Sequence, residues 1–167
     1  QEAFELENFF VNHRSKDSQG WKSLCIHGIG HDKTLSPDKY GFANEKEAPY
    51  QWTHVSGQAP ITTSWCKRLL EENYFEELYR VRFMWLESGG YINFHWDRPP
   101  GQCSLGPLNF ALNMPKNCYW VFKDWGIVPF KEGHGFAVDV SNIHGVWNFS
   151  KKSRIHIIVH GKYGSKY

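Results

Sequence analysis

The chain has no long apolar run and no concentration of charge of one sign. Its longest apolar stretches fall far short of the roughly 20 residues that a membrane-spanning helix requires. Basic and acidic residues number 19 and 17, and the longest basic cluster is the pair Lys151-Lys152. Binding to nucleic acid depends mainly on neutralising phosphates with a concentrated basic patch. We therefore expect neither a membrane nor a nucleic acid as a partner.

Cysteine is also sparse, with 4 residues in 167 and no CxxC spacing. This number and spacing disfavour a disulfide-rich scaffold. Free or buried thiols are typical of a reducing compartment, so we expect a cytoplasmic protein. Cys25, His27 and His31 resemble part of a zinc site, but zinc usually needs four ligands at tight spacing and no second pair is near.

Aromatic residues, in contrast, are abundant. They make up 17% of the chain, with 8 Trp and 12 Phe. β-Sheets accommodate such large flat side chains well. The length of 167 residues fits one domain. We expect a single domain over 1–167, with 1–79 as an N-terminal supporting region and 80–163 as the core.

Hydrophobic periodicity predicts one helix followed by many short strands. Apolar residues recur at near-helical spacing over 63–79. From Val81 to Trp85 they alternate, Gly89-Gly90 predicts a turn, and 91–96 reads as a returning strand, which together predict a hairpin. Further short strands are predicted at 105–114, 119–122, 127–131, 136–140 and 154–160. Short strands with regular turn signals are typical of a β-sandwich or a jelly roll.

A candidate metal site lies at the end of a predicted strand, in His95-Trp96-Asp97. Residues i and i+2 of a strand point to the same side, so one imidazole and one carboxylate can meet at one ion. His144, at the tip between two predicted strands, is the best candidate for the third ligand. Two imidazoles and one carboxylate leave positions open, as Fe(II) requires for a chelating cosubstrate and O₂. So short a motif needs support from the rest of the sequence.

Arg154, ten residues after His144, supplies such support. Its guanidinium offers a planar set of donors that matches a carboxylate bidentately. Near the third metal ligand, it could hold the far carboxylate of 2-oxoglutarate while the other end of that molecule chelates the metal.

These motifs resemble those of the aspartyl/asparaginyl β-hydroxylase-like oxygenases. The resemblance is carried by the segments 82–97, 108–113 and 144–148, and by Phe136, Asp139, Ser141, Ser150 and Arg154. The pattern H-x-D, 46 residues, H, nine residues, Arg is similar to that of the free-proline hydroxylases of this branch.

The resemblance implies a mainly β fold, namely a double-stranded β-helix (jelly roll, cupin-like) with flanking N-terminal helices. It also implies Fe(II), 2-oxoglutarate as cosubstrate, O₂, and hydroxylation of an unactivated C–H bond. It assigns His95, Asp97 and His144 as metal ligands and Arg154 as the anchor of the cosubstrate.

The chain departs from the family members that act on protein residues. Those members carry an extra Arg and His in the strand after the first ligands, whereas 103–109 contains neither. Asn109 and Asn113, on one face of the predicted strand, are candidates to donate to the cosubstrate instead. Arg98 is a candidate for binding a substrate carboxylate, and Trp147 for a wall of the substrate pocket.

The departure favours a free amino acid or similar small molecule as the substrate. One alternative is hydroxylation of Asp or Asn side chains in a protein. Another is a non-redox, cupin-like metal-binding module, which the single carboxylate and the spacing to Arg154 disfavour. A degenerate scaffold that only binds a partner is disfavoured by the complete set of ligands.

Overall fold

The structure is a computed structural model of the chain. It describes residues 1–14, 16–99, 101 and 106–167. Contacts divide the chain into two compact units, the first made of 1–11, 23–83 and 158–167 and the second of 12–22 and 84–157. Leu105, the first residue of the strand predicted at 105–114, lies outside the described residues, and so does Cys103.

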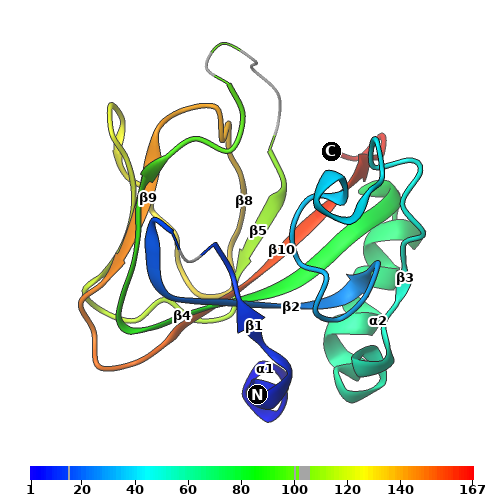
Figure 1. Ribbon diagram of the computed structural model, residues 1–167, viewed down its shortest axis with the longest axis horizontal. Helices are drawn as coiled ribbons and strands as arrows, with labels where there is room; N and C mark the ends of the chain where they lie inside the picture. The colour runs from blue at the N-terminus through cyan, green and yellow to red at the C-terminus, as the bar shows by residue number, and fades with distance from the viewer. Residues whose placement is uncertain (15, 100, 102–105) are drawn as a thin grey trace. The chain divides into compact units, whose positions relative to one another are not determined.

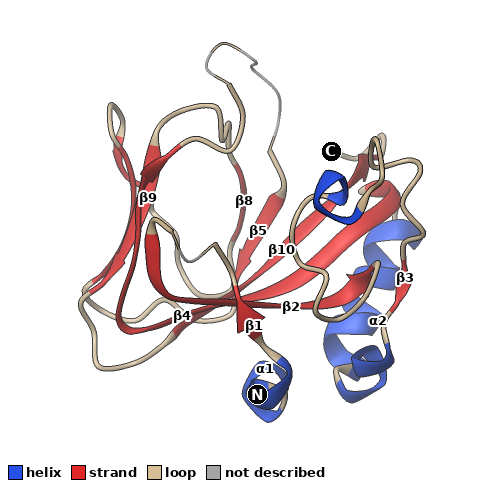
Figure 2. Cartoon of the chain, in the orientation of Figure 1, coloured by secondary structure: helices blue, strands red, loops and turns tan. Residues whose placement is uncertain are grey.

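The first unit holds the helices that the structure describes (Figure 2). They are α1 (Glu2–Glu5), α2 (Pro60–Glu71) and the 3₁₀ turns η1 (Glu7–Phe9), η2 (Pro37–Tyr40) and η3 (His54–Gln58). Helix α2 begins at Pro60. The first N–H groups of a helix have no partner within it, so the missing N–H of proline removes no hydrogen bond there. The carboxylate of Glu2 accepts the backbone N–H groups of Ile61 and Thr62 at 2.6 and 3.0 Å, and so caps the start of the helix.

The predicted helix 63–79 is correct for its first half only. Helix α2 ends at Glu71, Asn73 adopts a left-handed φ of 60°, and strand β4 (Phe75–His95) begins two residues later. The segment 75–79 therefore belongs to a strand. The strand β2 (Ser18–Gly28) was not predicted from the sequence. It pairs with β1 (Val11–Asn12), β3 (Gln51–Trp52) and β4.

Within the described residues the strands form one mainly antiparallel sheet, paired in the order β7-β6-β9-β4-β10-β5-β8 (Figure 1). The remaining bounds are β5 (Leu108–Ala111), β6 (Cys118–Phe122), β7 (Gly126–Ile127), β8 (Gly135–Ala137), β9 (His144–Asn148) and β10 (Arg154–Tyr163). The expected mainly β jelly roll with N-terminal helices is confirmed.

The predicted hairpin at Gly89-Gly90 is wrong. Strand β4 continues through both glycines, and Gly89 has a left-handed φ of 73°. A glycine can adopt this conformation without a steric penalty, so the chain bends there and remains in the sheet. After the bend, Tyr91 and Ile92 pair with Trp147 and Val146 of β9.

The core of the second unit is an aromatic layer built on β6. The alternate residues Cys118, Trp120 and Phe122 are buried, and they pack with Leu86, Ile92, Ala111, Phe130 and Val146. Fully burying a large apolar side chain contributes roughly 1.5–3 kcal/mol. In the β6–β9 register, Trp120 lies opposite Val146 and Phe122 opposite His144. The aromatic layer therefore extends to the first residue of β9.

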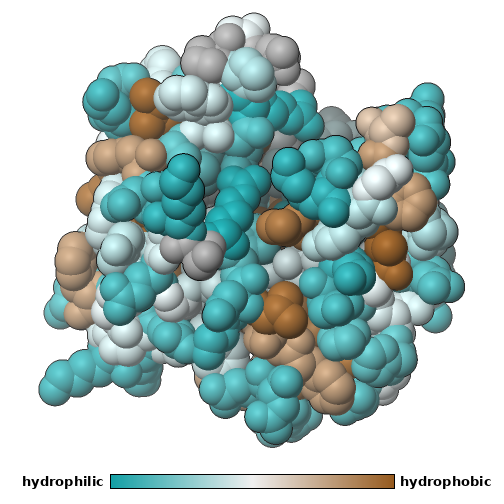
Figure 3. Space-filling model, in the orientation of Figure 1, coloured by the Kyte–Doolittle hydropathy of each residue, from teal (hydrophilic) through white to brown (hydrophobic). Residues whose placement is uncertain are grey.

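The described residues include no helix that is both long enough and apolar enough to cross a membrane. The face drawn in Figure 3 is mainly hydrophilic, with small and separated apolar patches. Cys25, Cys66 and Cys118 are buried and free, as expected for the cysteines that the structure describes.

Candidate active site

Two histidines meet where paired strands end. His95 is the last residue of β4 and His144 the first of β9, and the two are antiparallel partners. A register irregularity between Ile92 and His95 displaces the end of β4 relative to β9. The ring centroids of the two histidines lie 4.5 Å apart.

Both imidazoles are oriented by the same local hydrogen bond. Nδ1 of His95 lies 2.8 Å from the carbonyl oxygen of Asn93, and Nδ1 of His144 lies 2.8 Å from that of Asn142. A carbonyl can only accept, so Nδ1 must carry the proton in each ring. The lone pair of the neutral ring is then on Nε2, which is the arrangement that a metal-ligating histidine needs.

Asp97 completes the cluster from the segment after β4. Its backbone N–H donates to the carbonyl of Val140 at 3.0 Å, which fixes this segment. Its Oδ1 lies 3.6 Å from Nε2 of His95. One potential ligand atom from each of His95, Asp97 and His144 lies within 4.8 Å of the others. The structure therefore brings the three predicted metal ligands together.

No other group of this kind occurs among the described residues. In particular, the partial zinc pattern does not converge. Nδ1 of His27 lies 2.9 Å from the carbonyl of Tyr79, and the thiol of Cys25 faces the carbonyl of Lys33 at 3.5 Å.

Charge within the cluster favours a bound cation. Burial alone would raise the pKa of Asp97, but the contact with His95 and the charges of Arg14 and His144 outweigh burial and hold the pKa well below its usual range. Burial lowers the pKa of His144. For His95, burial lowers the pKa, but the contact with Asp97 and the bond to Asn93 leave it raised overall. The cluster thus offers an ionised carboxylate and an imidazole that stays neutral at neutral pH.

Arg14 is a member of the site that sequence reasoning missed. Its guanidinium donates to Oδ1 of Asp97 at 2.8 Å, and its φ of 48° is unusual for a residue with a side chain. The two residues are 83 positions apart. No local sequence pattern links them. The available signal was the strand β2, which follows Arg14 and pairs with β4, the strand that carries His95.

Arg154 is a buried cation without an acidic partner. It is the first residue of β10 and 2% exposed. Its guanidinium lies over the rings of Phe130 and Trp120, 5.0 and 6.0 Å from their centroids. No described acidic residue forms an ion pair with it, and its Nε has no hydrogen-bond partner. Burial lowers the pKa of Arg154 to about 10, so it remains charged at neutral pH.

His144 and Arg154 rest on the same aromatic layer. Phe122 stacks on the ring of His144 with centroids 5.2 Å apart, and Trp120, two residues earlier on β6, lies under Arg154. Because residues i and i+2 share one face of a strand, β6 supports the imidazole and the guanidinium from the same side.

The two predicted asparagines have different surroundings. The Asn109 amide donates to the carbonyl of Pro107 at 3.0 Å, and the side chain is 5% exposed. Asn113 lies beyond the end of β5, and its amide hydrogen-bonds to backbone groups of Ser153 and Ile155.

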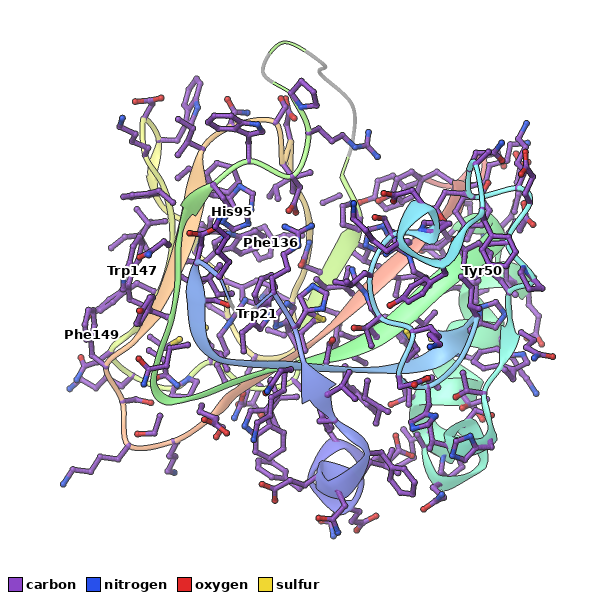
Figure 4. All side chains as sticks on the ribbon, viewed as in Figure 1. Trp21, Tyr50, His95, Phe136, Trp147 and Phe149 are labelled. Carbon is purple, nitrogen blue, oxygen red and sulfur yellow. The ribbon has the colours of Figure 1, made fainter. Side chains whose placement is uncertain are left out.

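The structure does not bring Trp147 to the metal cluster. Three positions after His144 on β9, it lies on the opposite face of the strand, where its ring contacts that of Phe94 at 4.9 Å. Figure 4 shows His95, Phe136 and Trp21 on the inner side of the sheet and Trp147 and Phe149 on its outer side. Arg98 directly follows Asp97 and is exposed.

A jelly roll that gathers two imidazoles and one carboxylate at the ends of its strands is the architecture of mononuclear non-haem metal oxygenases. The sequence pattern of the aspartyl/asparaginyl β-hydroxylase family matches residues 1–162. The chain belongs to this family, and its class is that of the 2-oxoglutarate-dependent non-haem iron hydroxylases. No curated protein sequence matches it significantly.

Solved structures of similar fold include several hydroxylases. A prolyl-4-hydroxylase of Pseudomonas putida aligns with a TM-score of 0.52 at 12% identity, over 95% of this chain and 80% of its own. A prolyl hydroxylase of Trichoplax adhaerens, in complex with a peptide of hypoxia-inducible factor, aligns with a TM-score of 0.56 at 13% identity, over 99% and 76%. OsALKBH1 aligns with a TM-score of 0.50 at 11% identity, over 94% and 88%. At such identities these similarities show the fold.

Proposed function

We propose that this protein uses Fe(II), 2-oxoglutarate and O₂ to hydroxylate an unactivated C–H bond of a free amino acid or a similar small molecule. The observation that supports this proposal best is the meeting of His95, Asp97 and His144, with the guanidinium of Arg154, which has no acidic partner among the described residues, against the same aromatic layer as His144.

The donor set of the cluster fits Fe(II). Two neutral imidazole nitrogens and a carboxylate oxygen would hold the ion and leave positions for a chelating cosubstrate and for O₂. Bound there, iron would supply the oxidation in which 2-oxoglutarate is converted to succinate and CO₂ while a C–H bond becomes C–OH. The protein itself orients the ligands: the carbonyls of Asn93 and Asn142 fix the two rings, and the guanidinium of Arg14 fixes the carboxylate.

Arg154 would bind the far carboxylate of 2-oxoglutarate. A buried guanidinium whose Nε has no hydrogen-bond partner among the described residues is a costly arrangement unless an anion occupies the site at some stage of function. The surrounding rings exclude water, which strengthens a charge-assisted bond to a carboxylate. Asn109, which is buried, is a candidate for a further donor.

The preference for a small substrate rests on what is missing from the strand after the first ligands. Among its described positions, Gly106-Pro107-Leu108-Asn109 contains neither the Arg nor the His of the family members that act on proteins. Arg98, exposed beside Asp97, would bind the carboxylate of a free amino acid. We also propose a cytoplasmic location, which the free thiols of Cys25, Cys66 and Cys118 support.

A protein side chain is the second candidate substrate. It is favoured by the peptide bound to the structurally similar Trichoplax enzyme. Both candidates can be compared in one assay. The protein would be incubated with Fe(II), ascorbate and labelled 2-oxoglutarate, together with either free amino acids or peptides that contain Asp, Asn or Pro.

We expect succinate and a hydroxylated product in equal amounts with a free amino acid, and loss of both in His144→Ala. An Arg98→Ala variant should raise KM for the amino acid and leave the slow, substrate-free turnover of 2-oxoglutarate unchanged. Product from peptides alone would favour the second candidate. Absence of succinate from every mixture, together with absence of 2-oxoglutarate binding to the Mn(II)-loaded protein, would reject the proposed function.

A further inference from the structure

The side chain of Asn113 contacts the backbone on both sides of Arg154. Its amide oxygen accepts from the N–H of Ile155 at 2.6 Å. Its amide nitrogen donates to the carbonyl of Ser153 at 2.9 Å. Ser153 and Ile155 are the two neighbours of Arg154 in the chain, so one side chain holds the peptide groups that flank the arginine.

The end of β5 explains why a side chain has this role. The strand ends at Ala111, and the N–H groups of Leu112 and Asn113 both donate to the carbonyl of Ile155 at 3.1 Å. Pro115, two residues further on, has no N–H to continue a ladder. A side-chain amide carries the same donor and acceptor as a peptide group. Asn113 therefore extends the pairing with β10 to the position of Arg154.

The guanidinium itself has little else to fix its direction. It has no acidic partner among the described residues, and the contacts that the structure gives it are the faces of Phe130 and Trp120. A cation over an aromatic face is attracted to the ring but is not held at one angle, in contrast to a bidentate hydrogen-bonded pair. The backbone of Arg154 must therefore set where its side chain points.

We propose that Asn113 is a positioning residue that aims Arg154 at the far carboxylate of the cosubstrate. The inference rests on the proposed function. It differs from a direct role of Asn113 in binding 2-oxoglutarate, because both ends of its amide already bond to the backbone. Its consequence is selectivity: removing Asn113 should weaken recognition of the far carboxylate more than recognition of the end that chelates the metal.

The test compares two keto acids that share the chelating end. 2-Oxoglutarate has the far carboxylate and 2-oxobutyrate lacks it. The Kd of 2-oxobutyrate divided by the Kd of 2-oxoglutarate therefore measures the contribution of Arg154. Calorimetry on the Mn(II)-loaded protein gives this ratio without turnover. We expect Asn113→Ala to lower the ratio about tenfold, which corresponds to roughly 1.4 kcal/mol. In an Arg154→Met background the same substitution should leave the ratio unchanged.

Asn148→Ala is the matched control. Asn148 is 1% exposed, and its amide donates to the carbonyls of Leu86, Glu87 and Lys152, none of which is adjacent to Arg154. This variant should lose at least as much stability and yet keep the ratio within about twofold. If Asn113→Ala does not fold, Asn113→Asp keeps the acceptor for Ile155 and loses the donor to Ser153, and it should give an intermediate ratio.

The outcomes separate the two proposals. A wild-type protein that binds both keto acids equally, or neither, would reject the role of Arg154 and this inference with it. A wild-type protein that discriminates, combined with an unchanged ratio in the Asn113 variants, would reject this inference and leave the proposed function standing. An equal loss of affinity for both keto acids would assign Asn113 a purely structural role.

Discussion

Replacing Arg154 with methionine should make the ligand-free protein more stable. Arg154 is 2% exposed and has no acidic partner among the described residues, so the folded state carries the cost of an uncompensated charge. Methionine is similar in length and apolar, and it can pack over the rings of Phe130 and Trp120 in place of the guanidinium. A residue retained at such a cost is expected at a binding site.

The magnitude follows from the pKa of Arg154, which burial lowers from 12.5 to about 10. At roughly 1.4 kcal/mol for each pH unit, the charge destabilises the folded state by about 3 kcal/mol. Loss of the contacts with the two rings offsets about 1–2 kcal/mol of this cost. We therefore expect Arg154→Met to raise the free energy of unfolding by about 1–2 kcal/mol, and Tm by roughly 2–8 °C.

The pH dependence of this difference has a definite sign. Below pH 10 the guanidinium is charged in both the folded and the unfolded state, so the difference between wild type and variant should be constant from neutral pH to pH 9. The wild type should recover stability relative to the variant only as the pH rises through about 10, because the folded state then releases a proton that the unfolded state retains.

The assay is urea unfolding with and without Mn(II) and 2-oxoglutarate. At a hundred times Kd the cosubstrate should stabilise the wild type by about 2.7 kcal/mol and the variant hardly at all, so the order of stability should reverse. Arg80→Met is the control: Arg80 is 6% exposed but pairs with Glu45 at 3.1 Å, so its loss should destabilise the protein. A loss of stability in Arg154→Met as large as that in Arg80→Met would refute the reasoning, as would equal stabilisation of wild type and variant by 2-oxoglutarate.

Three further predictions concern the metal cluster. Trp147→Ala should leave the Kd for 2-oxoglutarate within about twofold in calorimetry, because the ring lies on the outer face of β9. Gly145→Ala should raise the Kd for Mn(II) about tenfold and lower the free energy of unfolding by about 1–3 kcal/mol, because its Cβ would lie 2.9 Å from the carbonyl oxygen of Ile92 and push β9 away from β4. Affinity for Mn(II), measured by calorimetry, should fall as the pH drops through the raised pKa of His95, since only the neutral ring can bind the metal.

The metal cluster could be predicted from the sequence because part of it is local. His95 and Asp97 are only two residues apart, so they lie close together even though β4 ends at His95 and Asp97 follows the strand. The spacing to His144 and Arg154 belongs to a family pattern. Neither feature requires the three-dimensional path of the chain to be known. The mainly β fold followed in the same way from alternation and turn residues.

The position of Trp147 could not be predicted, because β9 was not recognised as a strand. His144 was placed at a tip between strands, where neighbouring side chains can point in any direction. Once His144 begins a strand, alternation directs Trp147 to the opposite face. The prediction of a hairpin was wrong for a related reason. The pair Gly89-Gly90 permits a sharp bend within a strand as readily as a reversal of the chain.

The contact of Arg14 with Asp97 and the hydrogen bonds of Asn113 to the backbone beside Arg154 depend on long-range pairing of strands. Neither has a local sequence signature. Asn113 and Ile155 are 42 residues apart, and their contact exists because β5 stops at Ala111. The sequence indicated a longer strand, on which Asn109 and Asn113 would share a face. The early end of β5 removes that alternation and turns the Asn113 amide toward the backbone of β10.

The aromatic layer on β6 explains how two polar groups from different strands can recognise one small molecule. Phe122 supports the ring of His144 and Trp120 lies under Arg154, and these two residues are one side-chain repeat apart on a single strand. Two residues of a strand span about 7 Å. The separation between the metal end and the guanidinium end is thus set by one rigid element, with no loop to vary it. Such a support can distinguish a short dicarboxylate of one chain length from homologues that are one carbon shorter or longer.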